Sequence, residues 1–215
     1  MKKENIDFLF IKLQEMYPDA NTELKYGNAF QLLISVMLSA QSTDKQVNKI
    51  TNILYKMVEG PKDILDMGLD RFTNLISSIN YYKTKAKNIF ETSKMLNQDP
   101  TIISPDIDVL QKLPGVGVKT AKVVSYVLFG SKVIAADTHV HRVSNRLGLV
   151  NTKMPEKTSE LLEKKVPDKY KGVAHHGLIL FGRYHCIARK PKCEICPFKD
   201  ICKFYRASIK KGGRA

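Results

Sequence analysis

Apolar residues recur with a helical period over almost the whole chain. At its start, Ile6, Leu9, Phe10 and Leu13 follow the i, i+3, i+4, i+7 spacing of one helix face, and Pro18 ends the pattern. No segment alternates apolar and polar residues as a half-buried strand would. No repeat or low-complexity linker interrupts the chain. The pattern therefore predicts an all-α fold.

One of the expected helices differs from the rest. Phe30–Leu38 is apolar on most sides, which predicts a helix buried at the centre of a domain. After it, Thr43 and Gln46 have the spacing of a capping box, and an apolar face continues to Met57 before Gly60 and Pro61 break it. The other helical patterns cover Leu69–Ile76, Ala86–Leu96, a helix capped at Ser104-Pro105 and running through Leu110, Thr138–Leu147, Pro155–Lys164 and Val173–Tyr184.

Composition narrows the classes of partner. The chain has 215 residues, of which 43% are hydrophobic, enough to bury a core in one domain or two small ones. Its 35 Lys and Arg against 21 Asp and Glu give a net charge of +14, which is typical of a polyanion binder. The N-terminus lacks the apolar run of a signal peptide, and the most apolar window is too short to span a bilayer. We therefore expect a soluble protein of the cytoplasm.

Two glycines around one valine form the most informative segment. Gly115 and Gly117 permit backbone angles closed to other residues, so the chain could turn tightly and direct N–H groups outward. An apolar helical stretch follows, and its first N–H groups would complete an anion site. The spacing of a nucleotide triphosphate P-loop is absent. The segment predicts either a phosphate-binding turn or an ordinary one.

Lys119 stands one turn into that otherwise apolar helix. Lysine is rarely enclosed by apolar neighbours unless it is paired or used. Desolvation and the helix N-terminal dipole would both disfavour its ammonium form and make the amine a nucleophile. The alternative is a side chain that extends to solvent, as Lys122 on the same helix could do.

The cysteines predict a metal site. The chain has only four, at Cys186, Cys193, Cys196 and Cys202, with the spacing C-x6-C-x2-C-x5-C. In an intracellular chain such close packing indicates metal ligation before disulfides. Four thiolates suit either Zn²⁺ or an iron–sulfur cluster, and ligand softness alone does not choose between them.

The motifs together resemble a known family. Leu-Pro-Gly-Val-Gly-Val-Lys-Thr-Ala at 113–121, with Ala-Asp-Thr-His at 136–139, is similar to the helix–hairpin–helix DNA glycosylases. The resemblance extends over nearly the whole chain. It implies a helical barrel-like domain over about 21–132 that contains the hairpin. Residues 1–20 with 133–215 would form a second helical domain carrying the cysteine loop, with DNA bound in the cleft between the domains.

The resemblance also implies a cofactor and DNA contacts. The cysteine spacing matches the [4Fe–4S] loop of such enzymes, in which Arg189, Lys190 and Lys192 would meet DNA phosphates. The glutamine of Ser-Ala-Gln-Ser-Thr at 39–43 would fill the gap left by an extruded base. Asn-Tyr-Tyr at 80–82 falls where many members have Gly-Leu-Tyr, so the residue at the wedge position is a tyrosine. The implied DNA-contacting residues are Gln41, Tyr81, Leu113, Gly115, Val116, Gly117 and Lys190.

The implied activity is that of a bifunctional glycosylase and abasic-site lyase of base excision repair. Lys119 would attack C1′ of the deoxyribose, expel an oxidised or ring-saturated pyrimidine and form an imine, after which β-elimination would cut the strand. Asp137 would stabilise positive charge on the sugar, or act simply as a helix N-cap. The partner would be double-stranded DNA containing damaged pyrimidines or abasic sites, and the enzyme a monomer.

Three alternatives differ in testable ways. Adenine glycosylases of the same fold use a glutamate where this chain has Ser35, and they lack the lysine. Another glycosylase of the fold could act on a different damaged base. A non-catalytic hairpin DNA-binding protein would need neither Lys119 nor Asp137.

Overall fold

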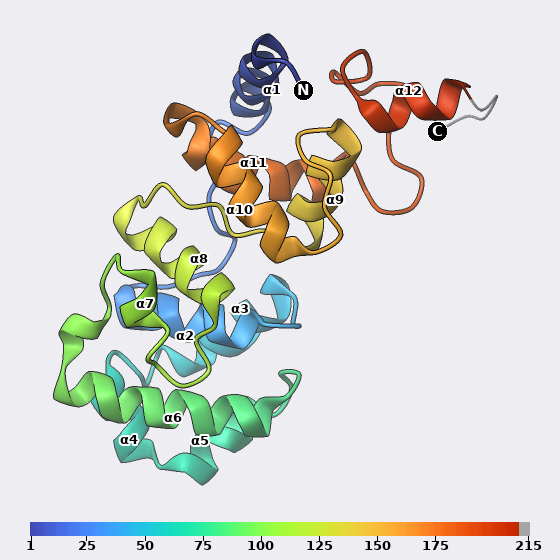
Figure 1. The fold of residues 1–215 in the computed structure, drawn as a ribbon. Helices are drawn as coiled ribbons and strands as arrows, with labels where there is room; N and C mark the ends of the chain where they lie inside the picture. Colours follow the sequence, from blue (N-terminus) through green and yellow to red (C-terminus); the bar gives the residue numbers. More distant parts are fainter. Residues whose placement is uncertain (211–215) are drawn as a thin grey trace. The chain divides into compact units, whose positions relative to one another are not determined.

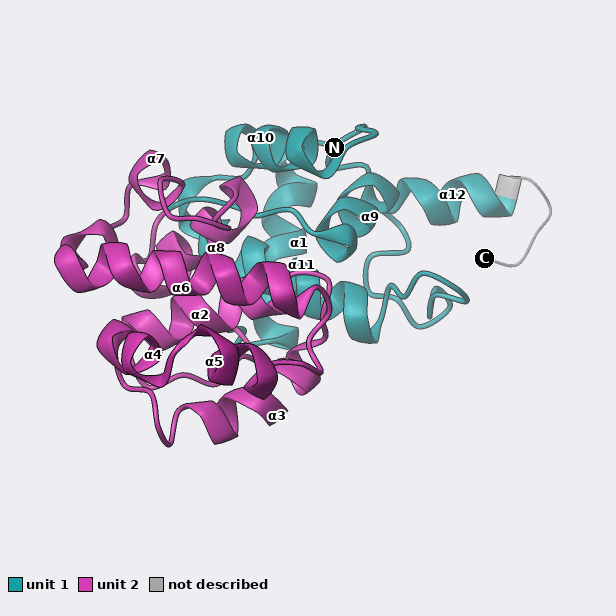
Figure 2. Ribbon diagram, turned by 90° about the horizontal axis from the view of Figure 1, so that it is seen from below, with its two compact units in different colours: residues 1–21, 132–215 teal, residues 22–131 magenta. Residues whose placement is uncertain are grey.

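The computed structural model describes residues 1–210, and this part of the chain is helical with no strand. The all-α prediction is confirmed. The chain forms two compact units, one of residues 22–131 and one that joins residues 1–21 to those from 132 onward (Figure 2). Within the described residues, no helix is long and apolar enough to cross a membrane.

The unit of residues 22–131 is built around α2 (Ala29–Ser39). Every residue of 30–38 is buried, as the apolar sequence predicts. Helix α2 packs against α3, α6 and α8, and Figure 1 shows it between the last two. The elements of this unit after α2 are α3 (Asp44–Leu54), α4 (Pro61–Met67), α5 (Leu69–Leu75), α6 (Tyr82–Gln98), the 3₁₀ turn η1 (Pro100–Ile102), α7 (Ile107–Leu110) and α8 (Val118–Phe129).

The other unit is organised on α11 (Lys171–Tyr184), which packs against α1 and α9. Gly182 permits the close approach of α9, since a Cβ there would lie 2.9 Å from Cβ of His139 and 3.1 Å from Cγ2 of Val143. The remaining elements are α1 (Lys3–Met16), α9 (Thr138–Leu147), α10 (Pro155–Lys165), the 3₁₀ turn η2 (Asp168–Tyr170) and α12 (Lys203–Lys210).

Two details of the helix ends differ from the sequence prediction. Thr43 Oγ1 accepts from the N–H of Gln46 at 3.2 Å, but the Gln46 side chain donates to the Ser78 carbonyl, so the capping box is only half made. Met57 does not continue the apolar face, because α3 ends at Leu54, and it is 41% exposed. The prediction that this face reaches Met57 was therefore wrong.

The start of α7 was also predicted wrongly. Its cap is Asp106, not the Ser104-Pro105 pair, and the Asp106 carboxylate accepts from the N–H groups of Asp108 at 2.8 Å and Val109 at 3.3 Å. The Asp106 carboxylate satisfies two N–H groups that have no partner within the helix. The helix therefore begins at Ile107, two residues later than a cap at Ser104 would place its start.

Buried His176 makes the stability of its unit pH-dependent. His176 lies on α11 with 5% of its surface exposed, and burial, reinforced by the charge of Arg183, lowers its pKa to about 4. Between that value and the ordinary value of about 6.5, the unfolded chain binds a proton that the folded chain does not. The stability contributed by the neutral ring is therefore complete above about pH 6.5 and is lost as pH falls toward 4.

We expect His176→Gln to reduce the loss of unfolding free energy between pH 7 and pH 5 by about 2 kcal/mol, at about 1.4 kcal/mol per pH unit below 6.5. Urea unfolding of both proteins at the two pH values measures this difference. Equal losses in the two proteins would contradict the assignment to His176.

Candidate functional site

The turn between α7 and α8 is anchored by two apolar side chains. Leu113 is 1% exposed and Val116 5% exposed, and both belong to the core of their unit. The Val116 N–H donates to the Leu113 carbonyl at 3.0 Å and closes the turn. At these two positions the side chains face inward, so only main-chain atoms could meet a ligand.

The two glycines of this turn have different roles. Gly115 has φ of +80°, and a Cβ there would lie 2.8 Å from both Cβ and Nδ2 of Asn88, so only glycine fits. Gly117 has φ of −85° and ψ of 173°, and a Cβ would meet nothing within 4 Å. The prediction that both glycines supply special backbone angles is correct for Gly115 and wrong for Gly117.

Gly117 instead leaves the start of α8 open. It is the N-cap residue, and no side chain caps the helix there. The first N–H groups of a helix have no partner within it, so those of Val118, Lys119 and Thr120 point outward with the positive end of the helix dipole. Val118 is 48% exposed, which leaves room for a group to approach. The arrangement is suited to an anion such as a phosphate.

Lys119 projects from this first turn, and its side chain is exposed. The prediction that apolar neighbours enclose it was wrong. The buried residues of α8 are Ala121, Val124 and Ser125, which face the core on the opposite side. The lysine therefore lies on the solvent side of an amphipathic helix, beside the open N–H groups.

Asp137 is the N-cap of α9. Its Oδ1 accepts from the Val140 N–H at 2.8 Å, and its side chain is half-buried. The capping role fixes one carboxylate oxygen and orients the other. Asp137 and Lys119 belong to different units of the chain.

Gln41 and Tyr81 share an uncommon backbone conformation. Both are in the left-handed region, with φ of 56° and 58°. Gln41 is exposed in the turn between α2 and α3, and Tyr81 is 66% exposed at the start of α6. A left-handed conformation costs a residue other than glycine about 1–2 kcal/mol, so neighbouring groups must hold both residues in place.

The basic residues before Cys193 are all exposed. Arg189, Lys190 and Lys192 lie on the loop that joins Cys186 to Cys193, and Lys190 has φ of 54°. The main chain of this loop is held by the Lys192 N–H, which donates to the His185 carbonyl at 3.2 Å. The loop therefore presents a cationic surface with a defined backbone.

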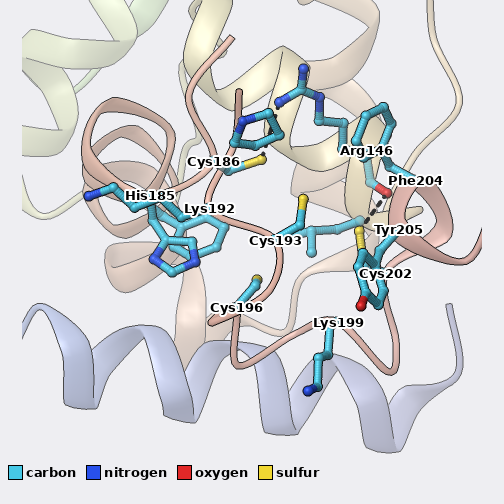
Figure 3. Close-up of a pocket in the computed structure, with 13 residues that line it drawn as sticks. Arg146, His185, Cys186, Lys192, Cys193, Cys196, Lys199, Cys202, Phe204 and Tyr205 are labelled. Carbon is cyan, nitrogen blue, oxygen red and sulfur yellow. Dashed lines mark hydrogen bonds between the residues drawn. The ribbon is translucent and has the colours of Figure 1, made fainter. Parts of the chain in front are cut away.

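The four cysteines line one pocket, of about 330 Å³ including its space open to solvent. Figure 3 shows their sulfur atoms around a common space, with Arg146 and Phe204 beside it. Burial raises the pKa of the Cys196 thiol to about 11, and it also raises the pKa of Cys193 and of Cys202. Thiols in such surroundings become stable thiolates only when a metal cation shares their charge.

The arrangement of the four thiols suits a cluster better than a single metal ion. Among the described residues, no three His, Cys, Asp or Glu side chains are gathered closely enough to hold a single metal ion. The four thiols nevertheless face one pocket from separate points of a short loop. A soft donor set arranged around a space of this size fits a cluster of several iron and sulfur atoms.

Two arginines of α9, which sequence reasoning missed, hold this loop. Arg146 Nη1 donates to the Ile187 carbonyl at 2.8 Å and lies 3.6 Å from Cys186 Sγ, and its Nη2 donates to the Ala188 carbonyl at 2.9 Å. Arg142 Nε donates to the Cys186 carbonyl at 3.2 Å. Their i, i+4 spacing was visible in the sequence, but nothing there indicated which carbonyl groups they would meet.

Comparisons with known proteins agree with the two motifs. Residues 34–168 match the HhH-GPD superfamily of base excision DNA repair proteins, and residues 186–202 match the iron–sulfur binding domain of endonuclease III. Endonuclease III of Bacillus subtilis (strain 168) is 44% identical over 211 residues, which cover 97% of this chain and 96% of that protein.

Two solved structures are similar along their whole length. A trapped endonuclease III–DNA covalent intermediate has a TM-score of 0.90 and 40% identity, covering 97% of this chain and 99% of the other. A non-covalent endonuclease III–DNA complex has the same TM-score and identity, covering 98% and 99%.

The different geometry of the two glycines gives a matched pair of variants. We expect Gly115→Ala to lower the free energy of unfolding by about 2 kcal/mol or more, from the positive φ and the clash with Asn88. Gly117→Ala should cost about 1 kcal/mol or less, since only the cap preference changes. Denaturant unfolding of both variants checks this, and equal losses would show that the turn differs from the one described.

Proposed function

The chain belongs to the endonuclease III family of the HhH-GPD superfamily of base excision DNA repair proteins, and from this premise we propose how its residues act. It is a DNA glycosylase and abasic-site lyase. We propose that it removes oxidised or ring-saturated pyrimidines from double-stranded DNA and cleaves abasic sites. The observation that carries the proposal is an exposed lysine beside the uncapped start of α8, in a chain similar to a trapped DNA covalent intermediate.

Lys119 is the proposed nucleophile. Its amine bonds to C1′ of the deoxyribose while the damaged base leaves with the electron pair of the glycosidic bond and takes up a proton. The ring oxygen then leaves C1′ as a hydroxyl with a proton that the attached nitrogen gives up, and the nitrogen is left as a protonated imine. The imine acidifies the C2′ hydrogen, whose removal expels the 3′ phosphate and cuts the strand.

The exposure of Lys119 changes one part of the sequence-based account. The apolar enclosure expected to activate the amine is absent, so DNA seated over the start of α8 would have to exclude the water. A base inside a duplex is also out of reach, which requires the nucleotide to be flipped out of the stack. In this proposal, activation and substrate binding are the same event.

Asp137 is proposed to stabilise the positive charge that develops on the sugar and to assist proton movement. One of its oxygens is committed to the Val140 N–H, which fixes the direction of the other. The capping and electrostatic roles are therefore compatible. The start of a helix also favours a negatively charged side chain.

DNA binding is proposed to combine two kinds of contact. The open N–H groups at the start of α8, together with Gly115 and Gly117, would hold a phosphate, and Lys190 in the cysteine loop would add a sequence-independent charge contact. Gln41 would fill the gap left by the flipped nucleotide. Tyr81, two-thirds exposed, would stack on a neighbouring base.

The cysteine loop is the site of a [4Fe–4S] cluster, with Cys186, Cys193, Cys196 and Cys202 as its ligands. When bound, the cluster supplies crosslinks that fold the loop, since metal binding and folding are linked. Arg146 and Arg142 then hold the loop backbone on α9, and Lys190 is presented from a fixed position. No cysteine is assigned to the cleavage chemistry.

The structure disfavours the adenine glycosylase alternative at Ser35. The residue is fully buried, its Oγ lies 2.7 Å from the hydroxyl of Tyr55, and that hydroxyl donates to the Gln31 carbonyl at 2.7 Å. Ser35 is therefore a core hydrogen-bonding residue and cannot replace a catalytic glutamate. Of the two remaining alternatives, a non-catalytic hairpin DNA-binding protein gives no purpose to Lys119, and a glycosylase that acts on another damaged base would differ in its substrate alone.

The proposed cellular location follows from the DNA substrate. We propose that the protein acts as a monomer in the cytoplasm on DNA of the nucleoid. The excess of 14 positive charges would support association with such a polyanion at low salt.

We expect Lys119→Gln to reduce glycosylase and lyase rates more than about a thousand-fold, while binding to lesion DNA is retained. The measurement is cleavage of a duplex carrying one thymine glycol, with borohydride present to reduce the imine to a stable covalent complex. Lys122→Gln, a matched change on the same helix, should still be trapped. Trapping of the Lys119 variant but not of the Lys122 variant would reassign the nucleophile.

We expect the wild-type protein to be brown and to contain about four irons per chain, and Cys193→Ser to lose the iron and unfold the loop. Iron analysis and visible absorption measure this. Ile195→Ser is the matched control, because it places the same hydroxyl on a side chain that is 75% exposed. A colourless wild-type protein with stoichiometric zinc would contradict the cluster assignment.

A further inference from the structure

The turns that carry Gln41 and Tyr81 are joined by hydrogen bonds that the mechanism above does not use. Both turns belong to the unit of residues 22–131, one following α2 and the other preceding α6. They are nearly forty residues apart in sequence. Three of these bonds come from the side chains of Asn80 and Lys85, which sequence reasoning did not single out, and a fourth comes from the main-chain N–H of Asn80.

Asn80 bonds to the Gln41 turn at two points. Its Nδ2 donates to the Gln41 carbonyl at 2.5 Å, and its backbone N–H donates to Ser42 Oγ at 3.3 Å. The first bond fixes the peptide unit of a residue held at φ of 56°. A glycine at position 80, as the family resemblance implies for many members, could not make it.

Lys85 bonds to the same turn from the first part of α6. Its ammonium donates to the carbonyl groups of Leu38 at 2.7 Å and of Ala40 at 2.6 Å. The Leu38 carbonyl is one of those that a helix end leaves without an internal partner. Partial burial lowers the pKa of Lys85, which is the effect of drawing an ammonium group out of water against the protein.

Left-handed conformations at ordinary residues persist only where surrounding contacts determine them. Here the residue before Tyr81 bonds to Gln41 itself, and a lysine of the next helical turn bonds to the residue before Gln41. The main-chain positions of the two residues consequently cannot move apart unless these bonds break. Because these bonds form when the protein folds, the conformational entropy of the two turns is already lost before DNA binds. DNA binding is therefore not weakened by ordering them.

We propose that Asn80 and Lys85 form a latch that holds Gln41 and Tyr81 as a preset pair, so that filling the gap and stacking on the neighbouring base happen together. The two latch residues are positioning residues for extrusion of the damaged nucleotide. This inference rests on the DNA-contacting roles proposed above for Gln41 and Tyr81.

The latch itself is tested without DNA. Asn80→Asp keeps the shape but replaces the donor with a carboxylate, and Lys85→Met keeps the length but removes the ammonium. Each should raise amide hydrogen exchange several-fold in peptides covering residues 39–43, where the Ser42 N–H donates to Ser39 at 3.0 Å. The matched controls Asn97→Asp and Lys87→Met, on exposed positions of α6, should not. Unchanged exchange in the latch variants would overturn the latch.

Its role in positioning is tested with two substrates. Single-turnover cleavage of a paired duplex carrying one thymine glycol should be about ten-fold slower in Asn80→Asp, as expected for one lost hydrogen bond. With the same lesion in an unpaired bubble, where no gap in a stack has to be filled, the effect should be under about two-fold. Equal slowing on both substrates would mean a general structural defect and overturn the positioning role.

A double-mutant cycle with Gln41→Ala decides whether Asn80 acts through Gln41 or independently of it. If Asn80 acts through Gln41, then Asn80→Asp should add less than about two-fold on the Gln41→Ala background. A full additional ten-fold would overturn action through Gln41. Failure of the wild-type protein to cleave either substrate would instead overturn the proposed function, and the exchange measurement would still decide whether the latch exists.

Discussion

The burial of α2 on all sides is the constraint on which the unit of residues 22–131 depends. Residues 30–38 are all buried, so each neighbouring helix has to pack against α2 in a fixed register. Helix α8 carries Lys119, and α6 begins beside Tyr81. The C-terminal end of α2 leads directly to Gln41. Because protein interiors are close-packed, a change at α2 is transmitted to all three positions.

Burial also explains the few polar groups in that core. Gln31 is 7% exposed, and its side chain donates to the Val58 carbonyl at 2.9 Å and accepts from the Gly27 N–H at 2.7 Å. Ser35 shares hydrogen bonds with Tyr55. Both side chains are satisfied, and leaving either one unpaired would cost about 1–3 kcal/mol. The residues of this unit that are proposed to act on DNA therefore lie outside the centre of α2. They are in the turn that follows α2 and on or beside the neighbouring helices α6 and α8.

The cysteine loop, in contrast, keeps its shape with little hydrophobic core of its own. Between Cys186 and Cys202 there is little apolar sequence with which to fold, and Phe198 is the one fully buried apolar side chain in that stretch. Arginine side chains from α9 and ligation of a cluster take the place of a core. This arrangement allows a loop dense in positive charge to keep one shape.

Local sequence was sufficient for the features that depend on local physics. The helical period gave the all-α class, the apolar run 30–38 gave the buried helix, and the spacing of the four cysteines gave a shared pocket. The helix Thr138–Leu147 was predicted with its observed bounds, because Asp137 before it and Gly148 after it are strong end signals. The resemblance gave the family, since its motifs are short and contiguous.

Tertiary structure decided the features that depend on which face of an element meets another. Apolar neighbours in sequence suggested that Lys119 is enclosed, but α8 buries Ala121, Val124 and Ser125, and this leaves the lysine outside. The two glycines of one motif are equivalent in the sequence pattern, but Asn88, distant in sequence, makes only Gly115 indispensable. The bonds from Asn80 and Lys85 to the Gln41 turn join residues 38 to 47 positions apart in sequence. Such contacts are set by the packing of whole helices, which no short window of sequence contains.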